Sequence, residues 1–226
     1  MINPFTPLDV IDKPDQLFGR SKEIKTIFEF LHGGCAVNIT GTYGVEKTSL
    51  IKVLLQQAEK ELNRQPVYVN LLGLGSEEEF FHTLCYEIGV EDCTGYSFSR
   101  SVKDKRILLA IDESQNTDAF TTAAQLMMRG LSEGTNAPIK LVYSSTKPLT
   151  HDAEIKGSHL AGISIDLELQ CWDEKICRDF VDYHLDGTLI DFSEAEIVDL
   201  ISRSKGHPKT FKTLCYWLTK EKYEAK

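Results

Sequence analysis

Between residues 21 and 169 the apolar positions change repeatedly from helical to strand spacing, and this pattern predicts helices that connect short strands. Apolar residues recur at helical spacing over 21–32, 47–62, 77–88 and 117–131. Short, largely apolar runs of strand type cover 35–40, 66–72, 106–111, 138–143 and 163–169. Because strands that alternate with helices are joined by right-handed crossovers, we expect a parallel sheet with helices on both faces.

Two of these runs predict where their strands lie in the sheet. Residues 107–111 are all apolar, which is typical of a central strand buried on both sides. Residues 163–169 alternate apolar with polar side chains, so one face of that strand is expected to meet water. We therefore expect this last strand at an edge of the sheet.

The pattern changes after Leu169, where strand-type runs stop and helical spacing continues. Helices are predicted over 173–186, 193–204 and 207–222, and a capping box of Ser193 and Glu196 opens the second. The Pro- and Asp-rich start of the chain predicts an extended arm instead. The predicted organisation is an arm, an α/β core and a small C-terminal α-helical subdomain, with boundaries 1–20, 21–170 and 171–226.

Composition and charge narrow the functional classes. Of 226 residues, 42% are apolar and 26% charged, which is the balance of a folded globular protein. The 34 acidic residues outnumber the 25 basic ones, and the net charge of −9 argues against a nucleic-acid partner. No apolar run is long enough for a membrane span, and the start lacks the pattern of a secretion signal. The six cysteines form no CxxC pair, so we expect reduced thiols in a cytoplasmic protein.

The most specific chemical motif lies between the first predicted strand and the helix that follows it. A glycine-bearing turn that opens a helix directs backbone N–H groups at an anion, and the helix dipole adds to the attraction. Lys47 is placed to reach the β- and γ-phosphates of ATP or ADP, and Thr48 to ligate Mg²⁺. The candidate nucleotide-binding residues of this loop are Gly41, Thr42, Tyr43, Gly44, Val45, Glu46, Lys47, Thr48 and Ser49.

Glu46 departs from the phosphate-loop pattern GxxxxGK[ST], which has a glycine before the lysine. At about 5 Å from a phosphate, its carboxylate would cost roughly 3 kcal/mol at an effective dielectric of about 20. That energy corresponds to on the order of a hundredfold in affinity. Lys47, Mg²⁺ and an outward rotation of Glu46 would each offset part of this cost. The alternative is a helix-opening loop that has lost its ligand.

Asp112 and Glu113 directly follow the buried strand, and ligands of open α/β sheets bind beyond such strand ends. Asp112 is a candidate to hold Mg²⁺ through water, and Glu113 to orient or deprotonate an attacking water. Beyond the next strand, Ser145 is a candidate to polarise that water or sense the γ-phosphate, and Lys147 to neutralise phosphate charge. Alternatively, these groups only end strands or cap a helix.

Several motifs in order along the chain resemble the P-loop ATPases of the STAND class, within the wider AAA+-like group. Residues 17–24 resemble the F-x-GR-x-x-E box that precedes the first helix. Residues 41–49 are similar to a Walker A motif that is degenerate at Glu46, and residues 108–113 to a Walker B motif. Residues 145–147 resemble the sensor-1 region, with lysine where many members have arginine. Gly206-His207-Pro208 resembles the GxP motif of a helical lid.

The resemblance implies an ATP-binding sheet of strand order 5-1-4-3-2, with residues 171–226 as a lid. It also implies that Phe18, Gly19, Arg20 and Pro208 close on adenine. The implied function is a nucleotide-controlled switch with slow or no hydrolysis, which self-associates or binds a partner protein. One alternative is a nucleotide-free pseudo-ATPase that serves as an interaction scaffold, because of Glu46. Another is a DNA-loading ATPase of the origin-recognition or transposition type, against which the net charge argues.

Overall fold

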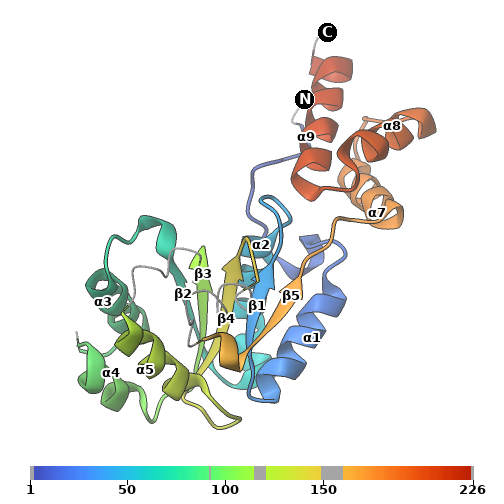
Figure 1. Cartoon of the computed structure of the whole chain (residues 1–226). Helices are drawn as coiled ribbons and strands as arrows, with labels where there is room; N and C mark the ends of the chain where they lie inside the picture. Colours follow the sequence, from blue (N-terminus) through green and yellow to red (C-terminus); the bar gives the residue numbers. More distant parts are fainter. Residues whose placement is uncertain (1–2, 92, 115–120, 149–159, 225–226) are drawn as a thin grey trace.

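The centre of the molecule is a parallel sheet. The computed structural model of the chain describes residues 3–91, 93–114, 121–148 and 160–224. Its strands are β1 (Ala36–Thr40), β2 (Gln65–Asn70), β3 (Ile107–Asp112), β4 (Ile139–Ser145) and β5 (Ser164–Glu168). Within the described ranges they form one five-stranded sheet in the order β2-β3-β4-β1-β5, with every pair parallel (Figure 1). The predicted fold class and the 5-1-4-3-2 order are confirmed.

Helices cover both faces of this sheet, because successive strand residues point to opposite sides. One face packs against α1 (Ser21–His32) and α2 (Lys47–Leu62). The other packs against α3 (Glu77–Ile88), α4 (Gly95–Val102) and α5 (Thr122–Ser132). Strand β3 is buried along its whole length, whereas the edge strand β5 is half-exposed, as the sequence pattern predicts.

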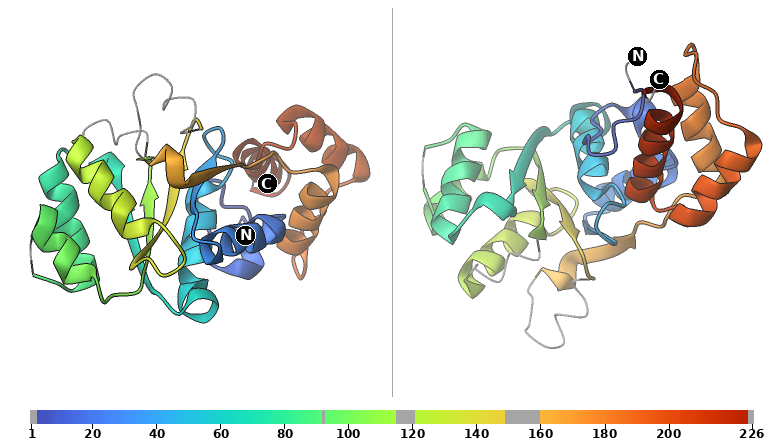
Figure 2. Two further views of the ribbon diagram at one scale, coloured as in Figure 1. Left: turned by 60° about the horizontal axis from the view of Figure 1, so that its bottom comes forward. Right: turned by 90° about the horizontal axis from the view of Figure 1, so that it is seen from above.

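The C-terminal helices form a separate unit that we call the lid, residues 171–224. It consists of α7 (Glu174–Leu185), α8 (Glu194–Ser204) and α9 (Pro208–Thr219), followed by a π-helical turn at Lys220–Glu224. The predicted capping box at Ser193 is present at the start of α8. The lid has its own hydrophobic cluster and lies beyond the end of the sheet at which β1 and β4 finish (Figures 1 and 2).

The N-terminal arm connects the lid to the core. Phe5 is 1% exposed and sits inside the lid cluster, with its ring 5.7 Å from that of Phe192 and 5.8 Å from that of Phe180. Further along, the backbone N–H of Ile11 donates to the hydroxyl of Ser49 in α2, at 3.0 Å. A short 3-10 turn (Pro14–Gln16) then leads into the segment before α1. The arm therefore contacts both units.

Two local details differ from the sequence pattern. Strand β2 ends at Asn70 because that side chain accepts a bond from the backbone N–H of Leu72, which starts a 3-10 turn. Helix α4 was not predicted, because it is short and rich in serine. Of the predicted helix 117–131, residues 117–120 lie outside the described part of the chain. Among the residues that are described, no helix is long and apolar enough to cross a bilayer.

Candidate functional site

The loop between β1 and α2 makes a tight turn that the sequence only partly suits. Gly41 and Gly44 have φ values of +145° and +88°, which glycine adopts freely. Glu46 has φ +76° and ψ +28°, a left-handed conformation that costs a non-glycine residue about 1 kcal/mol or more. The backbone thus makes this turn although the residue before Lys47 is not glycine. The first N–H groups of α2 have no partners within the helix and face the loop.

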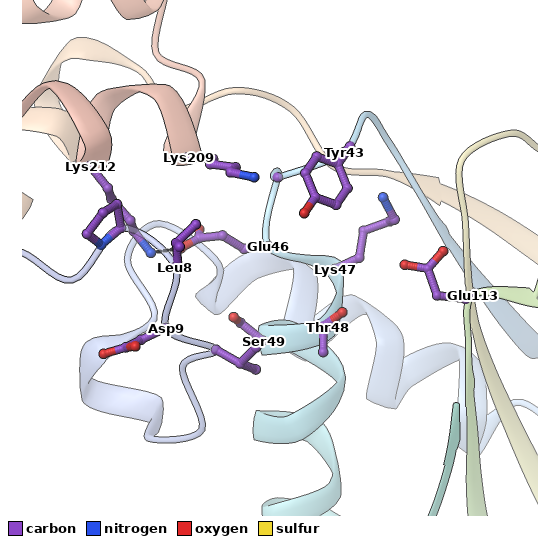
Figure 3. A pocket seen from close by; sticks show the side chains of 13 residues that line it. Leu8, Asp9, Tyr43, Glu46, Lys47, Thr48, Ser49, Glu113, Lys209 and Lys212 are labelled. Atoms are coloured by element: carbon purple, nitrogen blue, oxygen red, sulfur yellow. Dashed lines mark hydrogen bonds and ion pairs between the residues drawn. The ribbon is translucent and has the colours of Figure 1, made fainter. Parts of the chain in front are cut away.

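Lys47 folds back over this loop. Its ammonium donates to the backbone carbonyl oxygens of Gly41 at 2.8 Å and Thr42 at 3.1 Å. Burial lowers the pKa of Lys47, and the negative charges of Glu113 and Asp112 oppose that shift. The side chain points toward Glu113, into the space above the start of α2 (Figure 3). The ammonium of Lys47 therefore lies in the region in which the sequence analysis expects a nucleotide phosphate.

Asp112 is the most heavily bonded side chain of the site. One carboxylate oxygen accepts from the hydroxyls of Thr48 at 2.8 Å and Tyr68 at 3.0 Å. The other accepts from the hydroxyl of Ser144 and from the backbone N–H of Glu113. The two predicted Mg²⁺ ligands, Thr48 and Asp112, are thus in direct contact, although they are 64 residues apart in sequence.

Ser144 reaches Asp112 because the two side chains lie on the same face of the sheet, the face that α2 covers. Ser145 points to the other face, where its hydroxyl donates to Asn38 at 3.0 Å and to the carbonyl oxygen of Lys147 at 2.6 Å. The side chain of Lys147 is exposed. The structure therefore brings Ser144, which the motif analysis missed, to the predicted metal ligands. The period of two along a strand could have identified it.

A pocket surrounds the loop, and residues from the core, the arm and the lid line it (Figure 3). Of the predicted site residues it contains Tyr43, Gly44, Glu46, Lys47, Thr48, Ser49 and Glu113. The arm adds residues 7–10, and helix α9 adds Lys209 and Lys212, none of which a sequence motif identified. Glu113 has φ +59° and faces Lys47 across the pocket (Figure 3).

The lid contacts the loop between β1 and α2 directly. The ring Nε2 of His207 lies 3.0 Å from the carbonyl oxygen of Tyr43, and the backbone N–H of Lys209 donates to that of Gly44 at 3.3 Å. A Cβ atom at position 44 would come within 2.8 Å of the Cβ of Lys209, so this approach requires glycine. The GxP segment therefore packs on the loop through His207, while Pro208 is buried at the start of α9.

Glu46 points away from Lys47, toward the lid (Figure 3). Its carboxylate accepts a bond from the ammonium of Lys212 at 2.5 Å. The Nε of Arg20 lies 4.0 Å from its second oxygen. The carboxylate is thus turned outward and paired with a cation, so the repulsion expected between Glu46 and a phosphate is reduced.

The remaining predicted residues lie outside the pocket lining. The ring of Phe18 packs edge-on against Phe180 and Tyr183 of the lid, with centroids 5.4 and 5.3 Å away. Gly19 lies against Ile176 of α7. The guanidinium of Arg20 is buried beneath the loop and donates to the carbonyl oxygen of Val45 at 3.2 Å. This box therefore fixes the lid and the loop to each other, and adenine contact by Phe18 stays a prediction.

The residues present suit a nucleotide with Mg²⁺. Hydroxyl and carboxylate oxygens are the ligands that Mg²⁺ prefers, and it commonly takes only one or two from the protein. Thr48 and Asp112 supply them beside the ammonium of Lys47 and the free N–H groups of α2. In the described part of the chain no group of three His, Cys, Asp or Glu could hold a metal without such help. When bound, Mg²⁺ would neutralise phosphate charge.

Comparison with known proteins shows the fold but no sequence family. No family model matches the sequence, and no curated protein matches it. The Walker-type ATPase PABY2304 of Pyrococcus abyssi matches with a TM-score of 0.72 and 16% identity, over 96% of this chain and 72% of that one. The ORC1 protein of Aeropyrum pernix in complex with DNA has a TM-score of 0.68 and 15% identity, over 99% and 64%. The ORC2 protein of A. pernix in its ADP form gives 0.68 and 16%, over 97% and 67%.

The chain therefore has the α/β fold of P-loop ATPases of the AAA+ type, and it spans only part of the length of these proteins. At such low sequence identity, structural similarity shows a shared fold and does not show a shared activity. The comparison corrects one expectation, namely that the negative net charge argues against a nucleic-acid partner. A protein of the same fold is solved with DNA, so net charge alone does not support that exclusion.

Proposed function

We propose that the chain is the nucleotide switch of a STAND-type signalling ATPase. It binds ATP or ADP with Mg²⁺, hydrolyses ATP slowly or not at all, and in one nucleotide state self-associates or binds a partner protein. The observation that carries the proposal is the convergence of Lys47, Thr48, Asp112 and Glu113 at the start of α2. Each has the chemistry that phosphate, Mg²⁺ or an attacking water requires.

The contacts of the lid support a switch rather than a simple binding site. Helix α9 touches the loop through His207, Lys209 and Lys212, so a ligand that rearranges the loop changes the contacts that position the lid. A ligand shifts an equilibrium only by its difference in affinity for the two states. Loop residues that bind both phosphate and lid provide such a difference.

Slow hydrolysis agrees with the placement of the sensor-1 residues. The hydroxyl of Ser145 is turned away from Asp112, and the side chain of Lys147 is exposed. Neither residue belongs to the lining of the pocket. Glu113 is the one proposed catalytic residue that lines the pocket in the described part of the chain.

A thermal-shift titration with ADP and ATP, each with and without Mg²⁺, tests the proposal. At a hundred times Kd, ligand binding stabilises a protein by about 2.7 kcal/mol, which raises the Tm of a domain of this size by roughly 5–10 °C. Lys47→Ala is expected to abolish the shift. The matched control is Lys60→Ala on the same helix, whose exposed ammonium pairs with Glu61 and lies outside the pocket lining. No binding of either nucleotide at millimolar concentration in calorimetry would contradict the proposal.

A scaffold without nucleotide is the second candidate function. The cations of the site already have partners within the chain: Lys47 bonds its own loop, and Lys212 bonds Glu46. On this alternative, wild type binds no nucleotide and Glu46→Gly creates or greatly strengthens binding.

A DNA-loading ATPase is the third candidate, because the fold is shared with a protein solved with DNA. A salt-sensitive gel shift with duplex DNA would favour it.

A further inference from the structure

Three buried charges meet where the phosphate loop touches the lid. Glu46 belongs to the loop, Arg20 to the segment before α1, and Lys212 to α9. Their side chains are 7%, 2% and 8% exposed. Arg20 and Lys212 therefore flank the carboxylate of Glu46 in a place that water scarcely reaches, and Arg20 also pairs with the carboxylate of Glu23, at 3.3 Å.

The cations are held in place by groups other than Glu46. The guanidinium of Arg20 donates to the carbonyl oxygens of Val45 and Gln170, at 3.2 and 2.9 Å. The ammonium of Lys212 lies 5.5 Å from the ring centroid of Trp172 and 5.8 Å from that of Phe180. A buried charge is costly without a counter-ion, so two fixed cations on either side of one space favour an anion between them.

The carboxylate of Glu46 meets this requirement only in part. One oxygen bonds Lys212, but the other oxygen and the Nε of Arg20, 4.0 Å away, each lack a hydrogen-bond partner within the described residues. The backbone of Glu46 is also in a strained left-handed conformation. A well-fitted structural ion pair would leave neither buried atom unsatisfied.

We propose that Arg20 and Lys212 form an oxyanion site at the junction of core and lid, and that Glu46 is its built-in occupant. The ligand class is a tetrahedral oxyanion, the phosphate group of a nucleotide, which has more acceptor oxygens than one carboxylate. Lys212 lines the same pocket as Lys47 and Thr48, on the opposite side of the loop (Figure 3). The identification of the competing phosphate as part of a nucleotide rests on the proposed function. The occupation of the site by Glu46 does not depend on that function.

The consequence is a competition for Lys212. While Glu46 is paired with Lys212, α9 is linked to the loop, and the ammonium of Lys212 is not available to bind a phosphate. When a phosphate takes Lys212, Glu46 is released and the tie between lid and loop changes. Glu46 therefore lowers nucleotide affinity by occupying a cation, in addition to any direct repulsion of phosphate.

A double-mutant cycle without nucleotide tests the self-occupied site. Glu46→Gln keeps the size and the backbone conformation, and Lys212→Met keeps the aliphatic stem over the aromatic rings. Each single change is expected to lower the Tm, and the double variant to lose clearly less than the sum of the two. Lys220→Met is the matched control, because the ammonium of Lys220 also lies over an aromatic ring of the lid, 5.1 Å from the centroid of Trp217, and outside the pocket lining. The changes in Tm caused by this control and by Glu46→Gln are expected to add in the double variant. Additivity in the Glu46–Lys212 cycle would overturn the proposal.

Calorimetry with inorganic pyrophosphate tests the ligand class. Glu46→Gln is expected to bind pyrophosphate about tenfold more tightly than wild type, and Lys212→Met in that background to remove the gain. Lys220→Met should keep the gain. If the gain in pyrophosphate affinity persists after Lys212→Met, Glu46 acts only by repelling the anion directly. If Glu46→Gln gives no gain, there is no anion site. Either result overturns the proposal.

A titration of wild type with ADP separates this proposal from the proposed function. If wild type does not bind ADP while the Glu46–Lys212 cycle still shows coupling, the proposed function is wrong and the self-occupied site remains supported.

Discussion

At the scale of single residues, the carboxylate of Asp112 decides what the site can hold. It accepts from Thr48, Tyr68, Ser144 and the backbone N–H of Glu113. Burial raises the pKa of Tyr68 to about 12, with the negative charge of Asp112 adding to the shift, so this phenol remains a donor at neutral pH. Such bonds fix the carboxylate in one orientation, and the neighbours that orient a metal ligand commonly control metal affinity by 10–100-fold.

The neighbouring serines of β4 give a matched test of this arrangement. Ser144→Ala removes a bond to Asp112, so we expect the gain in ADP affinity that Mg²⁺ confers to fall by about tenfold. Ser145→Ala removes a bond to Asn38 on the other face, and we expect that gain to be unchanged even if the Tm falls. Calorimetric titration of ADP with and without Mg²⁺ measures both. Equal effects of the two changes would contradict the role given to Ser144.

At the scale of elements, the N-terminal arm is a structural tie between units. Phe5 fills the lid cluster, and His184 of α7 packs against it, with ring centroids 5.5 Å apart. The Nδ1 of His184 lies 3.1 Å from the carbonyl oxygen of Pro4. Burial lowers the pKa of His184 below 6.5, and the contact with Pro4 opposes that shift in part. The folded state therefore favours the neutral imidazole of His184 beside the arm.

The sign of the resulting pH dependence follows from linkage. Below pH 6.5 the unfolded chain binds a proton at His184 that the folded chain binds less readily, so stability falls as the pH drops through this range. We expect the Tm to fall between about pH 7.5 and about pH 5.5, and His184→Phe to reduce that fall. His32→Gln, at the exposed end of α1, is the control. An identical fall in wild type and His184→Phe would contradict this account.

Helix and strand periodicity also explains how much of the fold could be predicted. Most helix bounds follow from long periodic segments, and the sheet order was implied by the family resemblance that the motifs carry. Helix α4 was not predicted because only two buried apolar residues, Phe98 and Val102, mark its buried face. The side of β4 that carries Ser144 was predictable from strand alternation, but the motif directed attention to Ser145 instead.

At the scale of the whole molecule, the pocket belongs to three parts of the chain that are distant in sequence. Lys212 meets Glu46 across 166 residues, and the arm meets α2 across 38. No local pattern encodes such contacts, because they depend on how the lid packs against the core. The chemistry of the loop was therefore predictable from the sequence, whereas the partner of Glu46 was not.

This arrangement places the proposed nucleotide where core, arm and lid meet, so binding there acts on all three. The view from above shows the arm passing between the lid and α2 (Figure 2). A ligand in the pocket contacts the elements that fix the lid, and its presence is expected to change the position of α9. That coupling is the basis on which a nucleotide would control assembly.

A crystal structure of the chain grown with excess ADP and Mg²⁺ tests the central claim most directly. We expect the diphosphate over the start of α2, with Lys47 moved from the carbonyl oxygens of Gly41 and Thr42 to the phosphates. We also expect the metal beside Thr48 and Asp112. A pocket without nucleotide, in which Lys47 keeps its bonds to the loop, would contradict the account.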